Sequence, residues 1–423
     1  MPRSGTHSRR KPHDRNEQRQ FCDRRTATGL LVLLAAAFYL VFAAMPLFAD
    51  EFRLLPFITL RGEYNDNIFF SFTDEQDDWI STISPGLRLV DRTERLNSEL
   101  YGRFDLLYYG DNDDLDSTDG EAFGRLRYQV SPRFGFYTRA GYAKTSRPDR
   151  DIVETGLVQS AEPRDRYQFD AEGTYQVTEI VASSLQYDFD KLEYDDAEFI
   201  DSTIHSVRWG FVWAADRWVP NTDTRFFLGY ANGDYETSQV DSYSLTVGAE
   251  WDYSEIWSVS ADAGVRYTET EFDVLNLGPG GFFIDQETSE RWSGIGVLSL
   301  IYKGAYTNWD LSFLNDVRNA PGRGGTALRT ELTGSLRHRF TEKISGTLRA
   351  GYYINDTDED LVAADPVDEQ TIRVEPGISI EITRDLFLDF AYKYVRIEDD
   401  IVDDTRVRNM VFAELYWQYP LIE

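Results

Sequence analysis

The chain has 423 residues, of which 27% are charged and 14% aromatic, and its formal net charge is −30 at pH 7. Such an acidic chain repels a phosphate backbone, so we expect no nucleic-acid partner. A mean hydropathy of −0.45 argues against a bundle of transmembrane helices.

The N-terminus has the pattern of an export signal. A stretch from Arg9 to Arg25 with seven basic side chains precedes an apolar run over residues 29–44, and Leu47-Phe48-Ala49 follows before Asp50. We predict that residues 1–49 form a signal peptide cleaved after Ala49. An uncleaved helical anchor is the alternative, although the run is short for a full membrane span. The only cysteine, Cys22, lies in this leader, so the mature chain contains no disulfide. Removing eight basic and three acidic residues would change the net charge from −30 to −35.

From Phe57 onward, segments of about ten residues alternate apolar and polar side chains. Over residues 96–109, for example, Leu100, Phe104 and Leu106 share one face, whereas Glu99 and Asp105 share the other. A period of two predicts strands and not helices. The predicted strands are 57–65, 79–90, 96–109, 121–130, 134–143, 167–177, 181–190, 203–214, 223–231, 242–252, 257–269, 291–302, 307–316, 328–340, 344–354, 371–382, 386–395 and 406–419.

The gaps between these strands alternate short and long. The gaps after even-numbered strands are mostly tight, and those after odd-numbered strands are long and rich in Asp, Glu, Asn and Gly. Outer-membrane barrels place short turns in the periplasm and long loops outside. Six tryptophans lie at or near strand ends on the short-turn side, where amphipathic rings are favoured: Trp213, Trp218, Trp251, Trp257, Trp309 and Trp417.

Residues 50–423 are therefore predicted to form an all-β fold, a transmembrane antiparallel up-and-down β-barrel of about 18 strands. The expected location is the outer membrane of a Gram-negative bacterium, with its lipid as a partner. A soluble β-sandwich or β-helix is the alternative, because half-buried strands of soluble sheets also alternate.

If the apolar face meets lipid, the polar face lines the lumen. The basic candidates for pore-lining residues are Arg61, Arg88, Arg103, Arg125, Arg127, Arg139, Arg329, Arg337, Arg349 and Arg373. The acidic candidates are Glu99, Asp105, Asp170, Glu172, Asp188, Glu250 and Asp262. Two interpretations are open: a constriction that orients a polar or charged solute, and cross-strand ion pairs that keep a wet interior satisfied.

A barrel of this size leaves an aqueous channel unless something fills it. We expect no plug domain before Phe57, so any narrowing must come from a long loop folded inward. The candidate loops are 144–166, 271–290 and 355–370, and a surface position is the alternative for each. The apolar content of 271–290 also suits packing against another loop or a neighbouring subunit.

Metal and catalytic chemistry find little support. Acidic clusters at residues 111–119 and 356–360 offer either calcium ligands or simple loop solubility, and their spacing does not fit a helix-loop-helix calcium motif. Only His205 and His338 remain after the leader, on distant strands, so we expect neither a catalytic triad nor a histidine metal site. No enzyme activity, resident metal or cofactor is predicted.

The first hairpin carries a family resemblance. The run Gly62-Glu63-Tyr64-Asn65-Asp66-Asn67-Ile68-Phe69, followed by Ile83-Ser84-Pro85-Gly86-Leu87-Arg88-Leu89, resembles the opening of the putative β-barrel porin type 2 family. These outer-membrane proteins are often associated with exopolysaccharide export systems. The resemblance implies a large single-chain barrel and a polysaccharide outlet with a periplasmic export partner. It supplies no catalytic or binding residues.

The leading functional prediction is an outer-membrane conduit for export of an extracellular polysaccharide. A general diffusion porin for small polar solutes is the first alternative. A plugged structural or adhesive barrel, whose acidic loops bind surface material, is the second.

Overall fold

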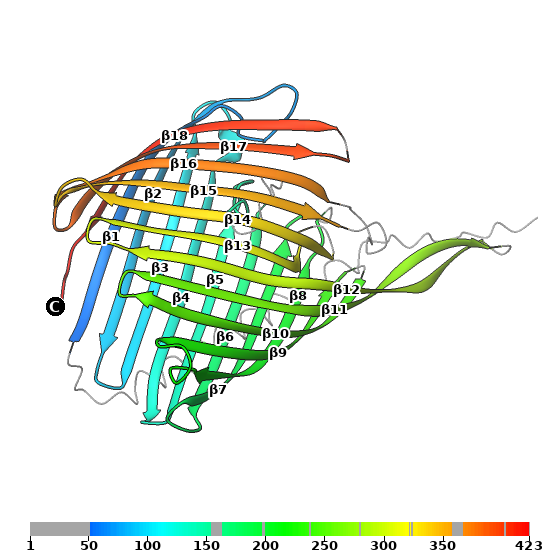
Figure 1. Cartoon of the computed structure of the whole chain (residues 1–423). Helices are drawn as coiled ribbons and strands as arrows, with labels where there is room; N and C mark the ends of the chain where they lie inside the picture. Colours follow the sequence, from blue (N-terminus) through cyan, green and yellow to red (C-terminus); the bar gives the residue numbers. More distant parts are fainter. Residues whose placement is uncertain are drawn as a thin grey trace, which may run out of the picture. The chain divides into compact units, whose positions relative to one another are not determined.

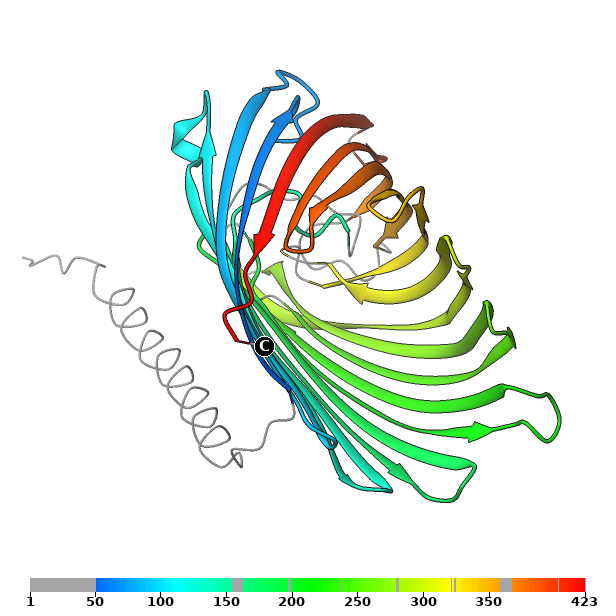
Figure 2. The same ribbon diagram turned by 90° about the vertical axis from the view of Figure 1, so that its left-hand side faces the viewer.

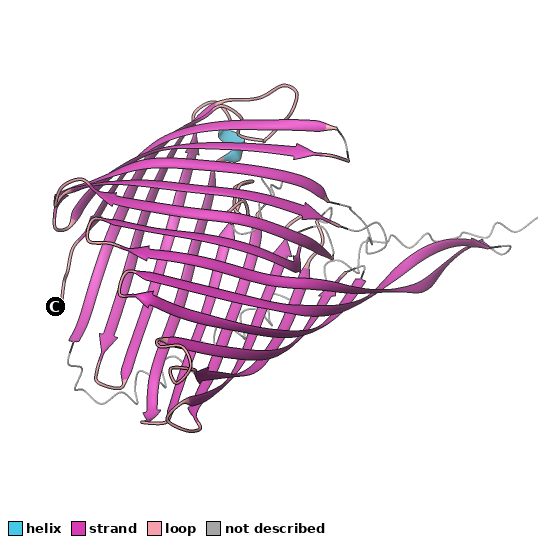
Figure 3. Cartoon of the chain, viewed as in Figure 1, coloured by secondary structure: helices cyan, strands magenta, loops and turns pink. Residues whose placement is uncertain are grey.

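The computed structural model of the chain describes residues 51–153, 163–196, 199–236, 238–278, 281–320, 322, 325–357, 367–401 and 403–422. These residues form one antiparallel sheet of 18 strands (Figures 1 and 3). The strands are β1 (Glu51–Asn65), β2 (Asp78–Arg92), β3 (Leu96–Tyr109), β4 (Ser117–Ser131), β5 (Phe134–Thr145), β6 (Arg164–Gln176), β7 (Val181–Tyr194), β8 (Ser202–Ala214), β9 (Thr222–Tyr235), β10 (Ser238–Ser254), β11 (Trp257–Gly278), β12 (Gly281–Lys303), β13 (Thr307–Asn319), β14 (Thr326–Arg339), β15 (Ile344–Asp356), β16 (Asp368–Thr383), β17 (Leu386–Asp399) and β18 (Asp404–Gln418).

The sheet closes on itself. Each strand pairs with its neighbours in sequence, and β1 pairs with both β2 and β18. Figure 2 shows β18, in red, beside β1, in blue, at this closing seam. The predicted closed barrel is thereby confirmed, and an open-edged sandwich is excluded.

The only helix in the described part of the chain is the 3₁₀ helix η1 (Asp113–Leu115). Among the described residues, there is no helix with the length and apolar content needed to cross a membrane.

All 18 predicted strands are present, and several are longer than the alternation indicated. β1 begins at Glu51 and passes through Pro56, which the sequence analysis left outside the strand. A proline has no N–H to donate, so strands accept it only where a hydrogen-bond partner is missing. Pro56 satisfies this condition because the pairing of β1 with β18 begins one residue later, at Phe57.

The outer surface of the barrel is apolar and has two aromatic belts. Exposed side chains such as Leu60, Leu87, Leu298 and Leu332 cover its middle. At the short-turn rim, rings meet in the pairs Trp213–Trp218, Trp251–Tyr253, Trp257–Trp309 and Trp417–Tyr419, with centroids 4.8–6.2 Å apart. At the opposite rim, the pairs Tyr64–Trp79, Tyr142–Tyr167, Tyr230–Tyr243 and Tyr267–Trp292 all have centroids 5.2 Å apart. Two belts that flank an apolar band are typical of a barrel that spans a bilayer.

One predicted loop is wrong. Residues 271–290 belong to strands: β11 continues to Gly278, and β12 begins at Gly281. Figure 1 shows this hairpin projecting beyond the ends of the other strands, so it does not fold into the lumen. The apolar residues that looked unusual for a loop are explained by the strand: Val, Leu, Phe and Ile favour extended backbone.

In the projecting part of the hairpin, the backbone groups pair only within the hairpin itself. Residues 273–278 pair with residues 281–286 of β12, whereas the pairing of β11 with β10 begins at Phe272. A gap predicted between the ninth and tenth strands shortens for the same reason, because β9 reaches Tyr235 and β10 begins at Ser238.

We expect a shortened hairpin, with residues 274–285 replaced by a two-residue turn, to fold as well as the full chain. The removed residues hydrogen-bond with one another in the sheet and leave every other strand pair intact. Heat-modifiable gel mobility and the thermal unfolding midpoint measure this, and both should be unchanged. Loss of the heat-resistant form would show that the projection is needed to assemble the barrel.

Candidate functional site: a lumen narrowed by a loop

The 17 predicted pore-lining residues lie on one face of the barrel. Cross-strand partners point to the same face of a sheet, and the register joins the candidates through pairs such as Glu99 with Arg125, Arg139 with Asp170, and Arg349 with Glu375. This face is opposite to the exposed leucines of the outer surface, so it faces the interior. That these residues line a conducting pore remains a prediction.

The wall formed by β1–β4 carries linked ion pairs. Glu99, which is 5% exposed, accepts from Arg88 at 2.7 Å and also from Arg125. Arg103 donates to Asp105 at 2.9 Å and lies 3.5 Å from Glu121. Glu99, Asp105 and Glu121 therefore each have at least one guanidinium partner.

The same pairing continues on other walls. Arg225 contacts Asp262 at 2.6 Å and Glu250 at 3.1 Å. Glu375 accepts from Arg349 at 3.0 Å and from Arg373 at 2.5 Å.

The other predicted lining residues make neutral contacts. These are Arg127 over the Tyr137 ring, Arg139 over the Phe123 ring, Thr138 to the backbone oxygen of Asp170, Thr174 to Glu172, Gln186 and Ser206 to Asp188, Arg329 to Asn355, and Arg337 to Ser345. The exception is Arg61 on β1, which forms an ion pair with Glu63 at 2.7 Å.

The connection from β5 to β6 crosses this lumen, as one of the three candidate loops was predicted to do. Its first residue, Ser146, donates its N–H to Asp119 on β4 at 2.9 Å. Arg147 then donates to Glu63 on β1 at 2.6 Å. Farther along, the carbonyl of Val153 accepts from the Tyr353 hydroxyl on β15 at 3.0 Å. Because β4 and β15 are far apart around the sheet, residues 146–153 must span the interior.

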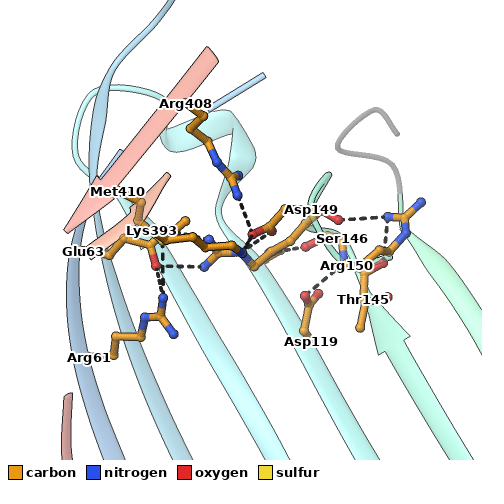
Figure 4. Close-up of polar contacts among 12 residues, drawn as sticks. Arg61, Glu63, Asp119, Thr145, Ser146, Asp149, Arg150, Lys393, Arg408 and Met410 are labelled. Atoms are coloured by element: carbon orange, nitrogen blue, oxygen red, sulfur yellow. Dashed lines mark hydrogen bonds and ion pairs between the residues drawn. The ribbon is translucent and has the colours of Figure 1, made fainter. Parts of the chain in front are cut away.

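Asp149 is the centre of this crossing (Figure 4). Its Oδ2 accepts from Lys393 on β17 and from Arg408 on β18, both at 2.9 Å, and its Oδ1 accepts from Arg147 at 3.2 Å. Figure 4 shows the Lys393 and Arg408 side chains converging on Asp149. One loop carboxylate thus joins two strands of the far wall.

Apolar contacts reinforce the crossing. Ile152 is fully buried in a cluster with Phe70, Val395 and Ile397. Phe70 belongs to the β1–β2 connection, and its ring lies 4.0 Å from the guanidinium carbon of Arg408. Nδ2 of Asn67 in the same connection donates to the backbone of Ser71 and of Val407. Two long connections therefore pack together over the β17–β18 wall.

The electrostatics keep Asp149 ionised. Burial by itself raises the pKa of a carboxyl, but Lys393, Arg408 and Arg147 together hold the pKa of Asp149 well below its ordinary value. Burial likewise disfavours the Arg147 cation, and Glu63 and Asp149 more than offset this, raising the pKa of Arg147. Removing one member of such a buried network leaves unpaired charges behind, at a cost of about 3 kcal/mol or more.

A second contact joins distant walls beside a chamber. The N–H of Ile200, between β7 and β8, donates to the carbonyl of Gly322, between β13 and β14, at 3.2 Å. A chamber of about 580 Å³ lies between β6–β8 and β13–β16. Its lining includes Arg166, Asp190, Arg349 and Arg373. The predicted inward loop therefore narrows an interior that still contains space.

Sequence reasoning identified loop 144–166 as a candidate but missed its anchors. Arg147 and Asp149 lie in a loop, where no alternation marks them. Arg408 lies on the inner face of β18, within the predicted strand 406–419, but was not among the predicted residues. The short run Arg147-Pro148-Asp149-Arg150-Asp151, with alternating charge and an apolar Ile152 after it, was the available signal. Residues 358–366 of the third candidate loop lie outside the described part of the chain.

Two carboxylates of the acidic cluster 111–119 have structural roles: Asp116 accepts from the backbone N–H of Tyr109, and Asp119 from that of Ser146. Asp78 on β2 accepts from the backbone N–H groups of Gly110, Asp111 and Asn112 at the start of this connection. Among the described residues, no three His, Cys, Asp or Glu side chains are grouped so that they could hold a metal ion. The described residues therefore give no support to the calcium hypothesis. Residues 358–360 of the second acidic cluster lie outside the described part of the chain.

A family comparison bears on the barrel's identity. Residues 47–208 match the sequence profile of the family described as Putative beta-barrel porin 2. The resemblance predicted from the first hairpin is confirmed. The match covers less than half of the chain, whereas the closed barrel and its two aromatic belts are those of a transmembrane β-barrel. No curated protein matches the chain.

Solved structures similar to the chain include other barrels. OpdO of Pseudomonas aeruginosa is 9% identical, with 88% of this chain and 98% of that chain covered and a TM-score of 0.44. OccAB2 of Acinetobacter baumannii is 10% identical, with 89% and 100% covered and a TM-score of 0.46. The copper transporter OprC is 10% identical with a TM-score of 0.44, and the match covers 84% of this chain but only 65% of OprC. Nothing about function follows from likeness at these levels.

We expect Asp149→Asn to release the loop from the far wall, because Lys393 and Arg408 lose their shared anion. A cysteine at Ile152, in a chain whose own Cys22 is replaced by Ser, reports the release, since this position is fully buried when the loop is docked. A loss of about 3 kcal/mol raises its labelling rate by roughly a hundredfold. Asp114→Asn, an exposed charge in another connection, is the matched control. Equal labelling in both variants would contradict the anchoring role.

The same reporter tests the pH dependence of docking. The pKa of Asp149 is lowered on folding, so its contribution is fully present above the unfolded value of about 3.9. That contribution is lost as the pH falls through the lower, folded value. We therefore expect slow labelling from pH 7 down to about 4.5 and faster labelling only in stronger acid. Release between pH 7 and pH 5 would show that another group controls the loop.

Proposed function

We propose that this barrel is an outer-membrane conduit through which an extracellular polysaccharide leaves the periplasm. The observation that carries the proposal is a lumen walled by ion pairs, narrowed by residues 146–153, and still containing a chamber of about 580 Å³. The family resemblance supports the choice of a saccharide.

Paired charges suit a long hydroxyl-rich solute. Arg88 and Glu99 already satisfy each other, as do Arg349 and Glu375, so neither pair binds a neutral chain strongly. Their remaining hydrogen-bonding groups can exchange contacts with hydroxyl groups one after another. Conduction needs this combination of many contacts and no deep trap.

In this proposal residues 1–49 act as the export signal, and a periplasmic partner delivers the polysaccharide to the short-turn rim. Short turns face the periplasm in barrels of this class. The solute therefore enters between the turns and passes the loop before it leaves.

A diffusion porin for small polar solutes is the second candidate. The observation in its favour is the crossing itself: a connection anchored on both walls leaves less room for a polymer than for a small molecule. A porin would give steady conductance and uptake defects, whereas a conduit for export would give secretion defects.

We expect deletion of the gene to abolish surface polysaccharide, and complementation with the intact chain to restore it. Staining and quantification of cell-surface polysaccharide measure this, alongside the uptake of small sugars and amino acids. Normal secretion with impaired uptake would replace the proposal by the diffusion porin. Normal secretion with normal uptake, and no conductance of the purified barrel in planar bilayers, would favour a structural role.

A further inference from the structure

A row of five aromatic rings crosses the inner wall of the barrel. The rings belong, in order around the sheet, to Phe387, Tyr416, Phe57, Tyr101 and Phe123. Successive centroids are 6.2, 5.7, 5.4 and 5.0 Å apart. The row continues to Arg139, whose guanidinium carbon lies 5.2 Å from the Phe123 centroid. The row therefore extends from β17 to β5.

The fold places every ring on the interior face. Tyr416 pairs with Phe387 and with Thr59, and Tyr101 pairs with Phe123 and with Arg88. These are positions of the same register face that carries the ion pairs. The exposed parts of these rings therefore face the lumen and not the lipid.

One glycine makes the row continuous. Between Phe57 on β1 and Tyr101 on β3 lies β2, where Gly86 stands opposite Phe57. A Cβ atom at Gly86 would lie 2.1 Å from the Phe57 Cζ atom, so only glycine leaves room for this ring. The Phe57 ring therefore covers β2 and contacts Tyr101 beyond it.

Polar groups border the rings on both sides. Arg88 and Glu99 lie near Tyr101 on one side, and Arg103 with Asp105 lies on the other. Arg61, on the same face of β1 four residues beyond Phe57, approaches Glu414 at 3.8 Å. The row is thus an apolar strip bordered by hydrogen-bonding pairs.

The row also has a direction. Phe387 is the second residue of β17 and Tyr416 is close to the end of β18, so both lie near the short-turn rim. Phe123 is in the middle of β4, and Asp119, four residues nearer the long-loop rim, holds the crossing loop through Ser146. The rings thus lead from the periplasmic mouth toward the constriction.

We propose that this aromatic row is a binding track for the sugar rings of a saccharide chain, a proposal that rests on the export function. A pyranose ring presents apolar C–H surfaces and a rim of hydroxyl groups. Aromatic carbons remove the C–H surfaces from water, and the bordering arginines and carboxylates hydrogen-bond the hydroxyls. Four of the five rings are partly exposed, so they are open to such contacts.

The test measures saccharide binding to the purified, detergent-solubilised barrel by isothermal titration, with maltohexaose, cellohexaose, chitohexaose and hexagalacturonate as probes. Tyr101→Ala and Phe123→Ala each remove one ring, whereas Tyr101→Phe keeps it. Phe227→Ala is the matched control: Phe227 also lies on the inner face, and Arg208 also lies 5.2 Å from its centroid, but it is not part of the row. Heat-modifiable gel mobility confirms that each variant folds.

We expect at least one hexasaccharide to bind and each ring deletion to weaken it by roughly five- to tenfold, in keeping with the energy of one aromatic contact. Tyr101→Phe and Phe227→Ala should bind as the unaltered chain does. The track is overturned if no hexasaccharide binds, or if Phe227→Ala weakens binding as much as the row variants. A hexapeptide that binds equally well would also overturn it, since the site would then select any amphipathic chain.

This outcome is separate from that of the proposed function. Saccharide binding with normal secretion in the deletion strain would keep the track and reject export. Loss of secretion without saccharide binding would keep export and reject the track.

Discussion

The structure depends on one constraint: every backbone N–H and C=O inside a bilayer needs a partner within the protein. A sheet meets this constraint only by closing, and here the pairing of β1 with β18 closes it. Closure separates an outer face from an inner one, so side chains two residues apart share an environment. The apolar exterior, the two aromatic belts and the polar lumen all follow from this alternation.

The inner face gathers charges of both signs, and the barrel pairs them. Arginines outnumber the carboxylates on some strands, and single carboxylates such as Glu99 and Glu375 then serve two guanidinium groups. This arrangement matches the cross-strand pairing that the sequence left as one of two interpretations. The inner wall therefore offers many hydrogen-bonding groups but few sites that would bind a solute strongly.

The crossing loop shows how a long connection becomes part of the wall. Asp149 contacts cations on β17 and β18, and Ile152 packs in an apolar cluster. An isolated loop of this length would lose much entropy on ordering. The ion pairs of Asp149 and the apolar contacts of Ile152 together offset that loss of entropy. The aromatic row below the loop is built by the same means, from residues distant in sequence that the register makes neighbours.

The sequence by itself determined the number of strands, their approximate positions, the face on which each residue lies and the sides of the short and long connections. These are local properties, because a period of two and a turn residue act within about ten positions. Only the tertiary structure decided that residues 146–153 enter the lumen, whereas residues 271–278 and 281–290 extend a hairpin. It also decided that Asp149 meets Arg408, and that five rings from β17, β18, β1, β3 and β4 form one row. Those features depend on closure, which brings together strands separated by hundreds of residues and leaves no periodic trace in the chain.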